Sequence, residues 1–492
     1  MPKYMISVDQ STQGTKALLF NEEGSLILRR DKEHKQIINN EGWVSHDPEE
    51  IYNNTLAVIK ELVEDSGIDK SQVLGLGISN QRETSVLWSR DTGKPLADAI
   101  VWQCSRASYI TEREIIAAKA DYIEERTGIK LSPYFPAAKI AWLLENTEGA
   151  DKLAKDHMVC HATIDSYLVY RLTNQKEYRI DYSNASRTQL FDIYELKWNG
   201  EICELFGIDP TNLPTVTDSD GIFGYTDVGG FFDKEIPICG VMGDSHAALF
   251  GQNCLKVGQT KTTYGTGSSI MMNIGKKPVK STHGVVTSLA WKRNGEVEYV
   301  LEGNLNYTGA TISWLKNDVE LIENAAQTSE LALKAHKDDE LYLIPAFTGL
   351  GAPYWDSHAK AAIIGMDRTT RKAELVRAAV ESIAYQITDV VKAMAEDANI
   401  EIGELRVDGG PTRNTYLMQF QSDILGARVM VPDAEELSGI GAAYMGGIAL
   451  KLWDESIFDS INRVAYEAAM SQDKRDSKYN GWKKAVKQVL TK

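Results

Sequence analysis

Long apolar segments are missing from this chain of 492 residues. No run of about 18 uncharged apolar residues occurs, so we expect no transmembrane helix. The N-terminal sequence MPKYMISVDQ also lacks the apolar core and the small-residue cleavage site of a secretory signal. We therefore predict a cytoplasmic protein that does not act at a membrane.

Cysteine is scarce as well, with five residues in the whole chain. None belongs to a CxxC pair and their number is odd, which is typical of buried reduced thiols rather than of a disulfide framework. The eight histidines show no metal-ligand spacing such as HExxH. A chain of this length can bury a substantial core, so it needs no disulfide or metal to hold it together.

Basic side chains are in deficit: 53 Lys and Arg stand against 69 Asp and Glu, a formal net charge of −16. A general nucleic-acid binder needs a basic surface to neutralise phosphates, so we expect no nucleic-acid partner. A ligand that carries phosphate remains possible, because backbone N–H groups and a metal ion can hold it. We interpret the bulk acidity as a property that keeps a soluble enzyme dispersed.

Two segments of the chain begin with a comparable pattern. Residues 4–8 form an apolar run that ends in Asp9, and residues 236–242 form one that ends in Gly243-Asp244. Each run predicts a buried strand, and a turn rich in Gly and Thr follows each of them. This weak likeness indicates two related α/β units or a coincidence between unrelated ones.

The length suits about three domains or two large ones, at roughly 150 residues each. No Pro/Gly/Ser-rich linker marks a boundary, and we place the break near residue 252, which gives domains of residues 1–252 and 253–492. The same patterns predict further strands at 17–20, 26–28, 73–78, 86–88, 100–102, 260–263 and 270–274. They predict mainly helical structure over 109–175 and a terminal helix from Tyr479. A helix of small residues is predicted over 438–447, and we interpret its composition as a sign of close packing between domains.

The segment from Asp9 to Lys16 can hold an anion and a cation. A carboxylate at a strand end can bind a metal ion, directly or through water. The small and hydroxyl residues after it can aim N–H and O–H groups at phosphates, and Lys16 adds a point charge. The alternative is an ordinary hairpin with a polar turn. The segment matches neither the GxxxxGK[ST] loop nor the GxGxxG fingerprint.

Two further glycine-rich turns follow predicted strands, at 264–269 (YGTGSS) and 406–414 (RVDGGPTRN). Glycine lets a backbone approach phosphate oxygens closely, and a planar ligand such as adenine could lie over the second turn. A tight hairpin turn and a strand-to-helix connection are the alternatives for the two segments.

Asp244 is the candidate general base, because it stands at a strand end where a hydroxyl could meet a phosphoryl donor. An N-cap of the following helix is a compatible second role.

The pair Arg82-Glu83 could bind a polyhydroxyl ligand, since each hydroxyl both donates and accepts, or form a surface salt bridge. Trp102 and Tyr134 could supply an apolar pocket wall, or pack in the core.

Longer strings in this order resemble the FGGY carbohydrate kinase family, and within it the glycerol kinases, over nearly the whole chain. The strings are residues 80–84 (NQRET), 100–104 (IVWQC), 133–135 (PYF), 181–188 (DYSNASRT), 345–356 (PAFTGLGAPYWD) and 417–426 (LMQFQSDILG).

The resemblance implies an α/β actin-like ATPase (ribonuclease H-like) fold, with two related domains flanking a catalytic cleft. It also implies ATP and Mg²⁺, a small polyol or sugar as the other partner, and a homodimer or homotetramer. It assigns the base to Asp244, the polyol contacts to Arg82, Glu83 and Tyr134, and a place near magnesium and the phosphates to Asp9. The nucleotide would be lined by Thr12, Gln13, Gly14, Lys16, Thr266, Gly309, Ser313, Gly410 and Asn414.

Two serines depart from the glycerol kinase pattern. Where those kinases usually carry Gln after the base, this chain has Ser245, and where they usually carry Phe against the polyol, it has Ser269. Serine is smaller than either, so we predict a wider and more polar pocket that would suit a longer polyol or a ketose. His246 could reach an extra hydroxyl of such a substrate, or serve only the structure.

Our hypothesis is ATP-dependent phosphorylation of a terminal hydroxyl of a small polyol, with glycerol as the leading substrate. The second candidate is a kinase for a C4–C5 polyol or ketose such as erythritol, xylitol or xylulose. An actin-like structural or chaperone ATPase would share the nucleotide turns without needing Arg82-Glu83 beside Tyr134 and Asp244. A dehydrogenase lacks support, because no GxGxxG follows the first strand.

Overall fold

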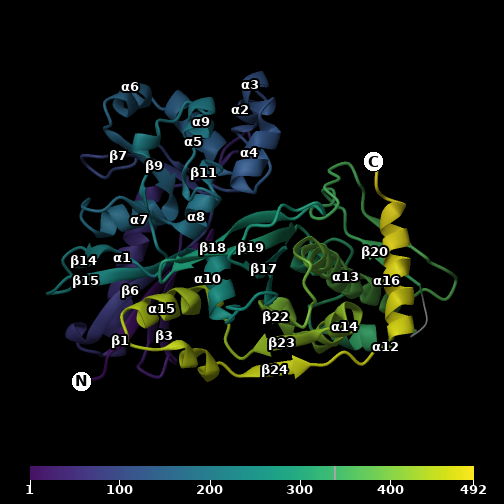
Figure 1. Ribbon diagram of the computed structural model, residues 1–492. Coiled ribbons are helices and arrows are strands. Elements are labelled where there is room, and N and C mark those ends of the chain that lie inside the picture. The colour runs from purple at the N-terminus through teal and green to yellow at the C-terminus, as the bar shows by residue number, and fades with distance from the viewer. Residues whose placement is uncertain (337–339, 492) are drawn as a thin grey trace.

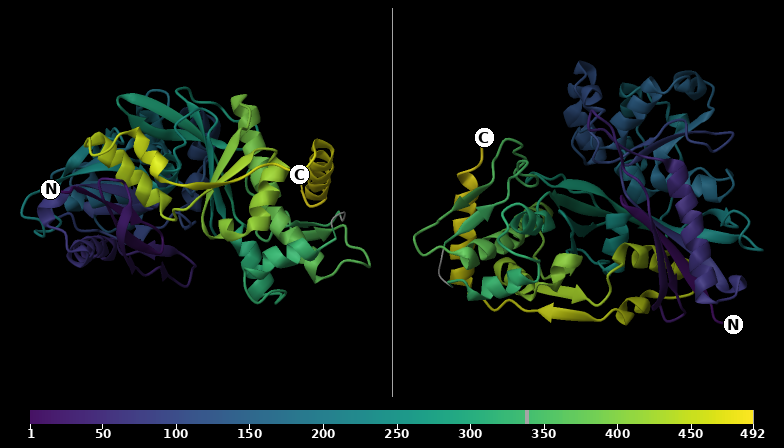
Figure 2. Two further views of the ribbon diagram at one scale, coloured as in Figure 1. Left: turned by 90° about the horizontal axis from the view of Figure 1, so that it is seen from below. Right: turned by 180° about the vertical axis from the view of Figure 1, so that it is seen from behind.

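The computed structural model describes residues 1–336 and 340–491, and two large sheets lie side by side in it (Figures 1 and 2). The first sheet has six strands in the order β14-β15-β6-β1-β2-β3. Their bounds are Ile222–Thr226, Ile236–Gly243, Val73–Asn80, Tyr4–Gln10, Gly14–Phe20 and Leu26–Glu33. The central strands β1, β6 and β15 run parallel and are almost wholly buried, because helices cover both faces of the sheet.

Helices from distant parts of the sequence cover this first sheet. Helix α1 (Pro48–Ser66) packs on β1, β2 and β3, and α15 (Leu437–Ala449) packs on β1, β6 and β15 (Figure 1). The backbone of α15 comes very close: a Cβ on Gly77 would lie 2.7 Å from the carbonyl oxygen of Ala442. The expected small-residue helix and its close packing are confirmed.

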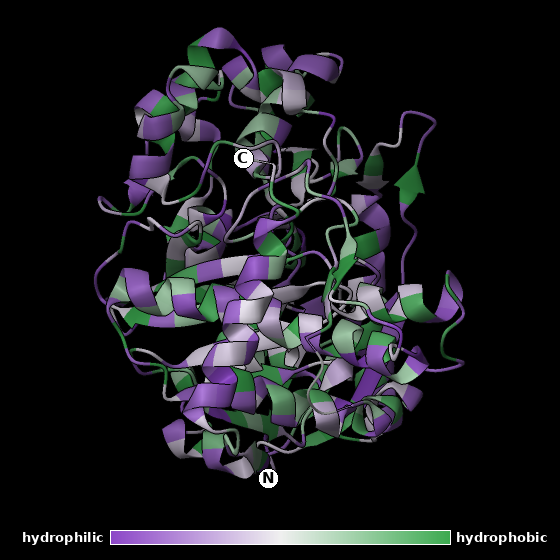
Figure 3. Ribbon diagram, turned by 90° about the vertical axis from the view of Figure 1, so that its right-hand side faces the viewer, coloured by the Kyte–Doolittle hydropathy of each residue, from purple (hydrophilic) through white to green (hydrophobic). Residues whose placement is uncertain are grey.

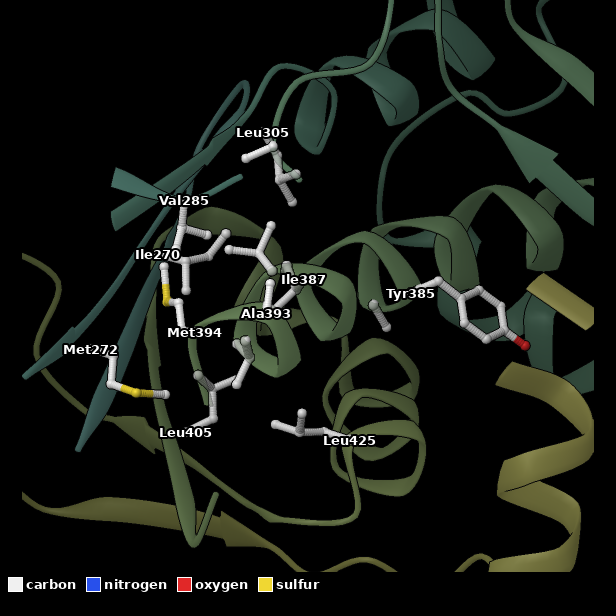
Figure 4. Close-up of a cluster of buried hydrophobic side chains, with 14 of the residues drawn as sticks. Ile270, Met272, Val285, Leu305, Tyr385, Ile387, Ala393, Met394, Leu405 and Leu425 are labelled. Carbon is white, nitrogen blue, oxygen red and sulfur yellow. The ribbon is translucent and has the colours of Figure 1, made fainter. Parts of the chain in front are cut away.

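The second sheet has seven strands in the order β18-β19-β17-β16-β22-β23-β24. Their bounds are Val286–Arg293, Glu296–Leu305, Ser268–Gly275, Thr260–Tyr264, Glu404–Asp408, Arg428–Pro432 and Arg463–Tyr466. The long helix α13 (Lys372–Ala398) packs against this sheet, and apolar side chains such as Ile270, Leu405 and Met394 fill the space between them (Figure 4).

A five-stranded sheet, β4-β5-β8-β7-β9, carries the segment at the top of Figure 1. Its strands span Ile37–Ile38, Val44–His46, Ala99–Ile100, Ser85–Ser89 and Val159–Thr163. Helices α2 (Ser108–Thr111), α3 (Glu114–Ala117), α4 (Ala120–Thr127), α5 (Pro136–Asn146), α6 (Ala150–Lys155) and α7 (Ile164–Leu172) complete this part of the chain. The buried strand β9 interrupts the stretch expected to be mainly helical, so that expectation was too broad.

Shorter elements connect these layers. They are β10 (Arg179–Asp181), α8 (Tyr182–Ser186), β11 (Phe191–Asp192), β12 (Lys197–Trp198), α9 (Gly200–Leu205), β13 (Thr215–Thr217), α10 (Asp244–Gly251), α11 (Gly309–Asn317), α12 (Gln327–Lys334), β20 (Tyr342–Ile344), β21 (Ala362–Ile364), α14 (Thr415–Leu425) and α16 (Gln472–Lys487). Short 3₁₀ segments lie at Lys70–Gln72, Pro210–Asn212, Gly410–Arg413 and Glu455–Ser460.

Two predicted boundaries were wrong. Strand β8 ends at Ile100, because Cys104 N–H bonds to Val101 O at 2.9 Å and closes a turn that contains Trp102. The terminal helix begins at Gln472 rather than at Tyr479, since its first two turns are polar and exposed and show no apolar period. Tyr479 and Trp482 are the residues that anchor this helix on the core.

Hydrophilic and hydrophobic residues are interleaved along the helices (Figure 3). Within residues 1–336 and 340–491, no helix is long and apolar enough to cross a membrane.

Candidate active site

Three parallel strands of the first sheet end at the same edge. The pairing sets Gln10 of β1 and Gly243 of β15 on either side of Asn80 of β6. Asp9 and Asp244 therefore meet at this edge although 235 positions separate them in the sequence. The likeness between the two segments that end in Asp thus has a geometric consequence, because the carboxyl ends of parallel strands lie together.

Asp244 is the first residue of α10 and faces a cavity of about 750 Å³. Its Oδ1 lies 3.4 Å from Arg82 Nε, and 37% of its side chain stays exposed. Gly243 occupies the N-cap, so the expected capping role of Asp244 was wrong. Its Oδ1 accepts instead from the N–H of Ser245 at 2.6 Å, and the carboxylate remains accessible to a ligand.

A buried network of two arginines and two glutamates lies beneath this cavity. Arg82 donates from Nη1 and Nη2 to the two oxygens of Glu302, at 2.9 and 2.7 Å. Arg187 donates from Nε to Glu83 Oε1 at 2.7 Å. Arg82 and Glu83 are both buried, so their interpretation as a surface salt bridge was wrong.

The charges of this network compensate one another. Burial alone would lower the pKa of Arg82, but Glu302 and Glu83 raise it well above its ordinary value. Burial alone would raise the pKa of Glu302, but Arg187 and Arg82 hold it well below its ordinary value. Such a buried set is tolerated only when each ion is paired and hydrogen-bonded, so these side chains have defined positions.

Sequence reasoning missed Arg187 and Glu302 as site residues. Arg187 stands in the family-like string 181–188, where a fully buried arginine could have been sought. Glu302 follows the apolar residues 299–301 in strand β19, and an acid directly after such a run is a signal of a buried partner.

Trp102 and Tyr134 form an aromatic wall of the cavity, with ring centroids 5.8 Å apart. Trp102 Nε1 donates to Thr12 Oγ1 at 2.9 Å, which ties this wall to the first phosphate-loop candidate. Burial raises the pKa of Tyr134. Both rings line the cavity, so the alternative that they pack only in the core was wrong.

Ser245 and Ser269 both line the same cavity and contact each other. Ser269 Oγ donates to Ser245 Oγ at 3.2 Å, although one residue is on α10 and the other on β17. His246 is fully buried below them, and its ring nitrogens make no hydrogen bond to any residue that the structure describes. Burial, then the charge of Arg82, lowers the pKa of His246 well below its ordinary value, so the imidazole is neutral.

The turn around Thr266 meets two other backbone segments. Gly309 N–H donates to Gly265 O at 3.0 Å, and a Cβ on Gly309 would lie 2.7 Å from that oxygen. Gly409 has φ of 97°, and a Cβ there would lie 2.0 Å from Tyr264 O. Glycine is required at both positions because the backbones touch.

The remaining nucleotide candidates surround these turns. Gly410 and Ser313 are exposed, and Asn414 caps α14 while donating to Thr328 Oγ1 at 2.9 Å. Ser313 is on α11, the helix that starts at Gly309. The structure brings Thr266 to the start of α11, where Gly309 lies, and Ser313 follows one turn further along that helix. The short 3₁₀ segment that begins at Gly410 packs beside strand β16, which leads into the same turn.

Lys16 is held by an acid that sequence reasoning missed. Its Nζ donates to Glu436 Oε2 at 2.8 Å and lies 4.0 Å from Asp9 Oδ2. In the loop before it, a Cβ on Gly14 would lie 2.7 Å from Lys32 O, so a larger residue would clash with β3. Thr12 and Gln13 are partly or fully exposed and accessible to a ligand.

Asp9 is the predicted ligand of a cation. Its Oδ1 accepts from Ser79 Oγ at 2.9 Å, and burial raises its pKa to about 6, against the opposing charge of Lys16. Within residues 1–336 and 340–491, no group of three His, Cys, Asp or Glu side chains could hold a metal ion. Mg²⁺ typically uses one or two carboxylates together with phosphates and water, and a lone buried Asp fits that pattern.

Two family models match the chain in succession: the N-terminal domain of the FGGY family of carbohydrate kinases over residues 4–251, and the C-terminal domain of that family over residues 260–450. The chain belongs to the FGGY family of carbohydrate kinases. As a member of this family it is a phosphotransferase that acts on a hydroxyl group and uses ATP. The dehydrogenase and structural ATPase hypotheses are thereby set aside.

Individual members of the FGGY family resemble the whole chain. Glycerol kinase 1 of Thermotoga maritima is 46% identical over 99% of this chain and 100% of that protein. A glycerol kinase of Fusobacterium nucleatum is 44% identical over 99% of both chains. The crystal structure of Plasmodium falciparum glycerol kinase with ADP superposes with a TM-score of 0.93 at 34% identity, covering 100% of this chain and 99% of that one.

The FGGY fold extends to kinases of other acceptors. Gluconate kinase from Lactobacillus acidophilus has a TM-score of 0.88 at 20% identity, covering 99% of this chain and 98% of that chain. The expected actin-like, two-domain α/β fold is confirmed by these likenesses.

Proposed function

We propose that this kinase transfers the γ-phosphoryl group of ATP to a terminal hydroxyl of glycerol, giving glycerol 3-phosphate. The observation that carries the proposal is the accessible Asp244 carboxylate, which faces the same cavity as the glycine turn at 265–267. Glycerol as the acceptor is supported by the relatives named glycerol kinases, which match the chain over its length at 44% and 46% identity.

Asp244 acts as the general base in this proposal. It accepts the proton of the terminal hydroxyl as that oxygen attacks the γ-phosphorus in line with the departing ADP. Arg82 lies on one side of the carboxylate, 3.4 Å from Oδ1, and leaves the side toward the cavity open. The acceptor hydroxyl would approach from that open side.

Arg82, Glu83 and Tyr134 would hold the acceptor, with Trp102 as the apolar wall. Tyr134 and Trp102 line the cavity, whereas Arg82 and Glu83 lie beneath its lining and are 6% and 1% exposed. The buried guanidinium and carboxylate have fixed orientations, so they would align the hydroxyls of the acceptor with Asp244. The aromatic pair excludes water from the site, which limits transfer of the phosphoryl group to water.

The nucleotide lies between the two sheets in this proposal. Backbone N–H groups and the hydroxyls of Thr12 and Thr266 would cradle its phosphates, with Lys16 adding positive charge. Gln13, Gly14, Gly309, Ser313, Gly410 and Asn414 would line the rest of the site. Asp9 would hold Mg²⁺, which would neutralise negative charge on the nucleotide phosphates when it is bound.

A screen of ADP release over glycerol, tetritols, pentitols and ketopentoses tests this function. We expect acceptor-dependent turnover with glycerol that disappears when Mg²⁺ is chelated by EDTA. Measurement of ADP with each acceptor and without any acceptor separates transfer from hydrolysis. ATP hydrolysis that no polyol or sugar accelerates would refute the proposal.

A second candidate acceptor is a C4–C5 polyol or ketose, and the Ser245–Ser269 pair favours it. Two small side chains leave space beside Asp244, and their hydroxyls can bond to further hydroxyls of a longer acceptor.

Ser269→Phe tests this second candidate. Phe fills the space and removes one hydroxyl, so kcat/KM for erythritol, xylitol or xylulose should fall about 10-fold or more relative to glycerol. Ser269→Ala is the matched control, because it removes the hydroxyl without filling the space. If all acceptors change equally in Ser269→Phe, the pair does not determine acceptor length.

A further inference from the structure

Glu302 connects the two sheets through the buried network. It lies on β19 of the second sheet, whereas Arg82 follows β6 of the first sheet and Arg187 follows α8, which packs on β18 (Figure 1). Glu302 is fully buried and also lines the cavity with Asp244. A carboxylate of the second sheet thus completes a pocket whose other charged groups come from the first half of the chain.

One carboxylate serves both arginines. Its two oxygens take both terminal nitrogens of Arg82, and its Oε2 also lies 3.0 Å from Arg187 Nη1. Because both terminal nitrogens of Arg82 are occupied, only Nε of that residue faces Asp244, at 3.4 Å. The orientation of Arg82 toward the candidate base is therefore set by Glu302.

Without the Glu302 charge, Arg82 would have another carboxylate within reach. Glu83 is already engaged by Arg187 Nε at 2.7 Å. The other oxygen of Glu83 lies 4.0 Å from Arg82 Nε, whereas Asp244 Oδ1 is nearer, at 3.4 Å. A guanidinium released from Glu302 could therefore turn its terminal nitrogens to Asp244 and bind that carboxylate with two N–H groups. Such a pair would cover the oxygen that the acceptor hydroxyl needs.

We propose that Glu302 is a positioning residue that fixes Arg82 for acceptor binding and keeps it from pairing fully with Asp244. The pocket is then complete only when the two sheets approach and bring Glu302 to both arginines. This inference rests on the proposed function, since it assigns a role within the same acceptor site.

Glu302→Gln and Glu302→Asp test the role in the full-length enzyme. Gln removes the charge, and Asp keeps it but is one methylene too short to hold both terminal nitrogens of Arg82 in the same geometry. We expect kcat/KM for the acceptor to fall about 10- to 100-fold in both variants, the size of a lost charge-assisted hydrogen bond. The KM for ATP should stay within about twofold of the wild-type value, because the network lies under the acceptor.

Glu296→Gln is the matched control, because Glu296 is on the same strand and forms an exposed pair with Lys276 at 2.8 Å. It should behave as the wild type. Should Glu302→Gln fail to fold, Glu302→Asp decides by the same measurements.

If Glu302→Asp has the same kcat/KM for the acceptor as the wild type, a negative charge at this position is sufficient for acceptor binding. That result would overturn the positioning role of Glu302. Equal losses for ATP and acceptor would overturn it as well. If the wild-type enzyme phosphorylates no polyol or sugar, the proposed function itself is refuted. Assays of the wild type alone show this result, so it is distinguished from a failure of the role proposed for Glu302.

Discussion

Asp244→Asn should lower kcat about 100- to 10,000-fold, the usual contribution of a general base. The amide has nearly the same shape, and its oxygen can still accept the 2.6 Å bond from Ser245 N–H, so the start of α10 should not change. It cannot take the proton of the acceptor hydroxyl. The KM for ATP should remain within about twofold, because Asp244 does not bind the nucleotide in this proposal.

Steady-state kinetics with saturating acceptor measures this effect. Asp233→Asn is the matched control, since Asp233 is an exposed acid just before β15, and it should leave kcat unchanged. Turnover in Asp244→Asn within tenfold of the wild type would exclude Asp244 as the base and would leave positioning as the main source of catalysis.

Arg82→Lys should lower kcat/KM for the acceptor about 10- to 100-fold, because a hydrogen bond to a charged group contributes about 1.5–3 kcal/mol and lysine cannot keep both bonds that Arg82 makes to Glu302. Lysine keeps the positive charge but cannot bond to both oxygens of Glu302 and face Asp244 at once. The buried carboxylate of Glu302 would be less well satisfied, so the melting temperature should fall too.

Kinetics for both substrates, together with thermal unfolding, test this second expectation. Arg30→Lys is a suitable control, because Arg30 pairs with Asp65 on the surface, where such pairs contribute little. A variant Arg82→Lys with wild-type acceptor kinetics and a lowered melting temperature would mean that Arg82 serves stability alone.

The sequence pattern was sufficient to predict the two strands that precede the candidate site residues Asp9 and Asp244. Short, mostly apolar runs before Asp9 and Asp244 indicated buried strands, and both residues stand at or just beyond the ends of parallel strands of one sheet. Small residues at 438–447 indicated a closely packed helix, which is confirmed because a side chain on Gly441 would meet the backbone of Ala247 at 1.8 Å. Local composition is sufficient to predict such elements, because a buried strand requires apolar side chains and a close contact requires small ones.

The sequence pattern could not predict which residues pair with the charged side chains of the site. Glu302 lies 220 positions from Arg82, and Glu436 lies 420 positions from Lys16. The pair Arg82-Glu83 looked compatible with an exposed salt bridge, although both residues are buried. Nothing in the adjacent sequence indicates which distant strand supplies the opposite charge.

What the sequence by itself determined is the family, the reaction class and the position of Asp244 at a strand end, because these depend on local strings and on the period of apolar residues. Only the tertiary structure decided that one glutamate of the second sheet holds two buried arginines from the first half of the chain, and that two serines beside Asp244 bond to each other. The reason is physical: charge pairing and pocket shape depend on distances between atoms, and those distances arise only when the two sheets pack together.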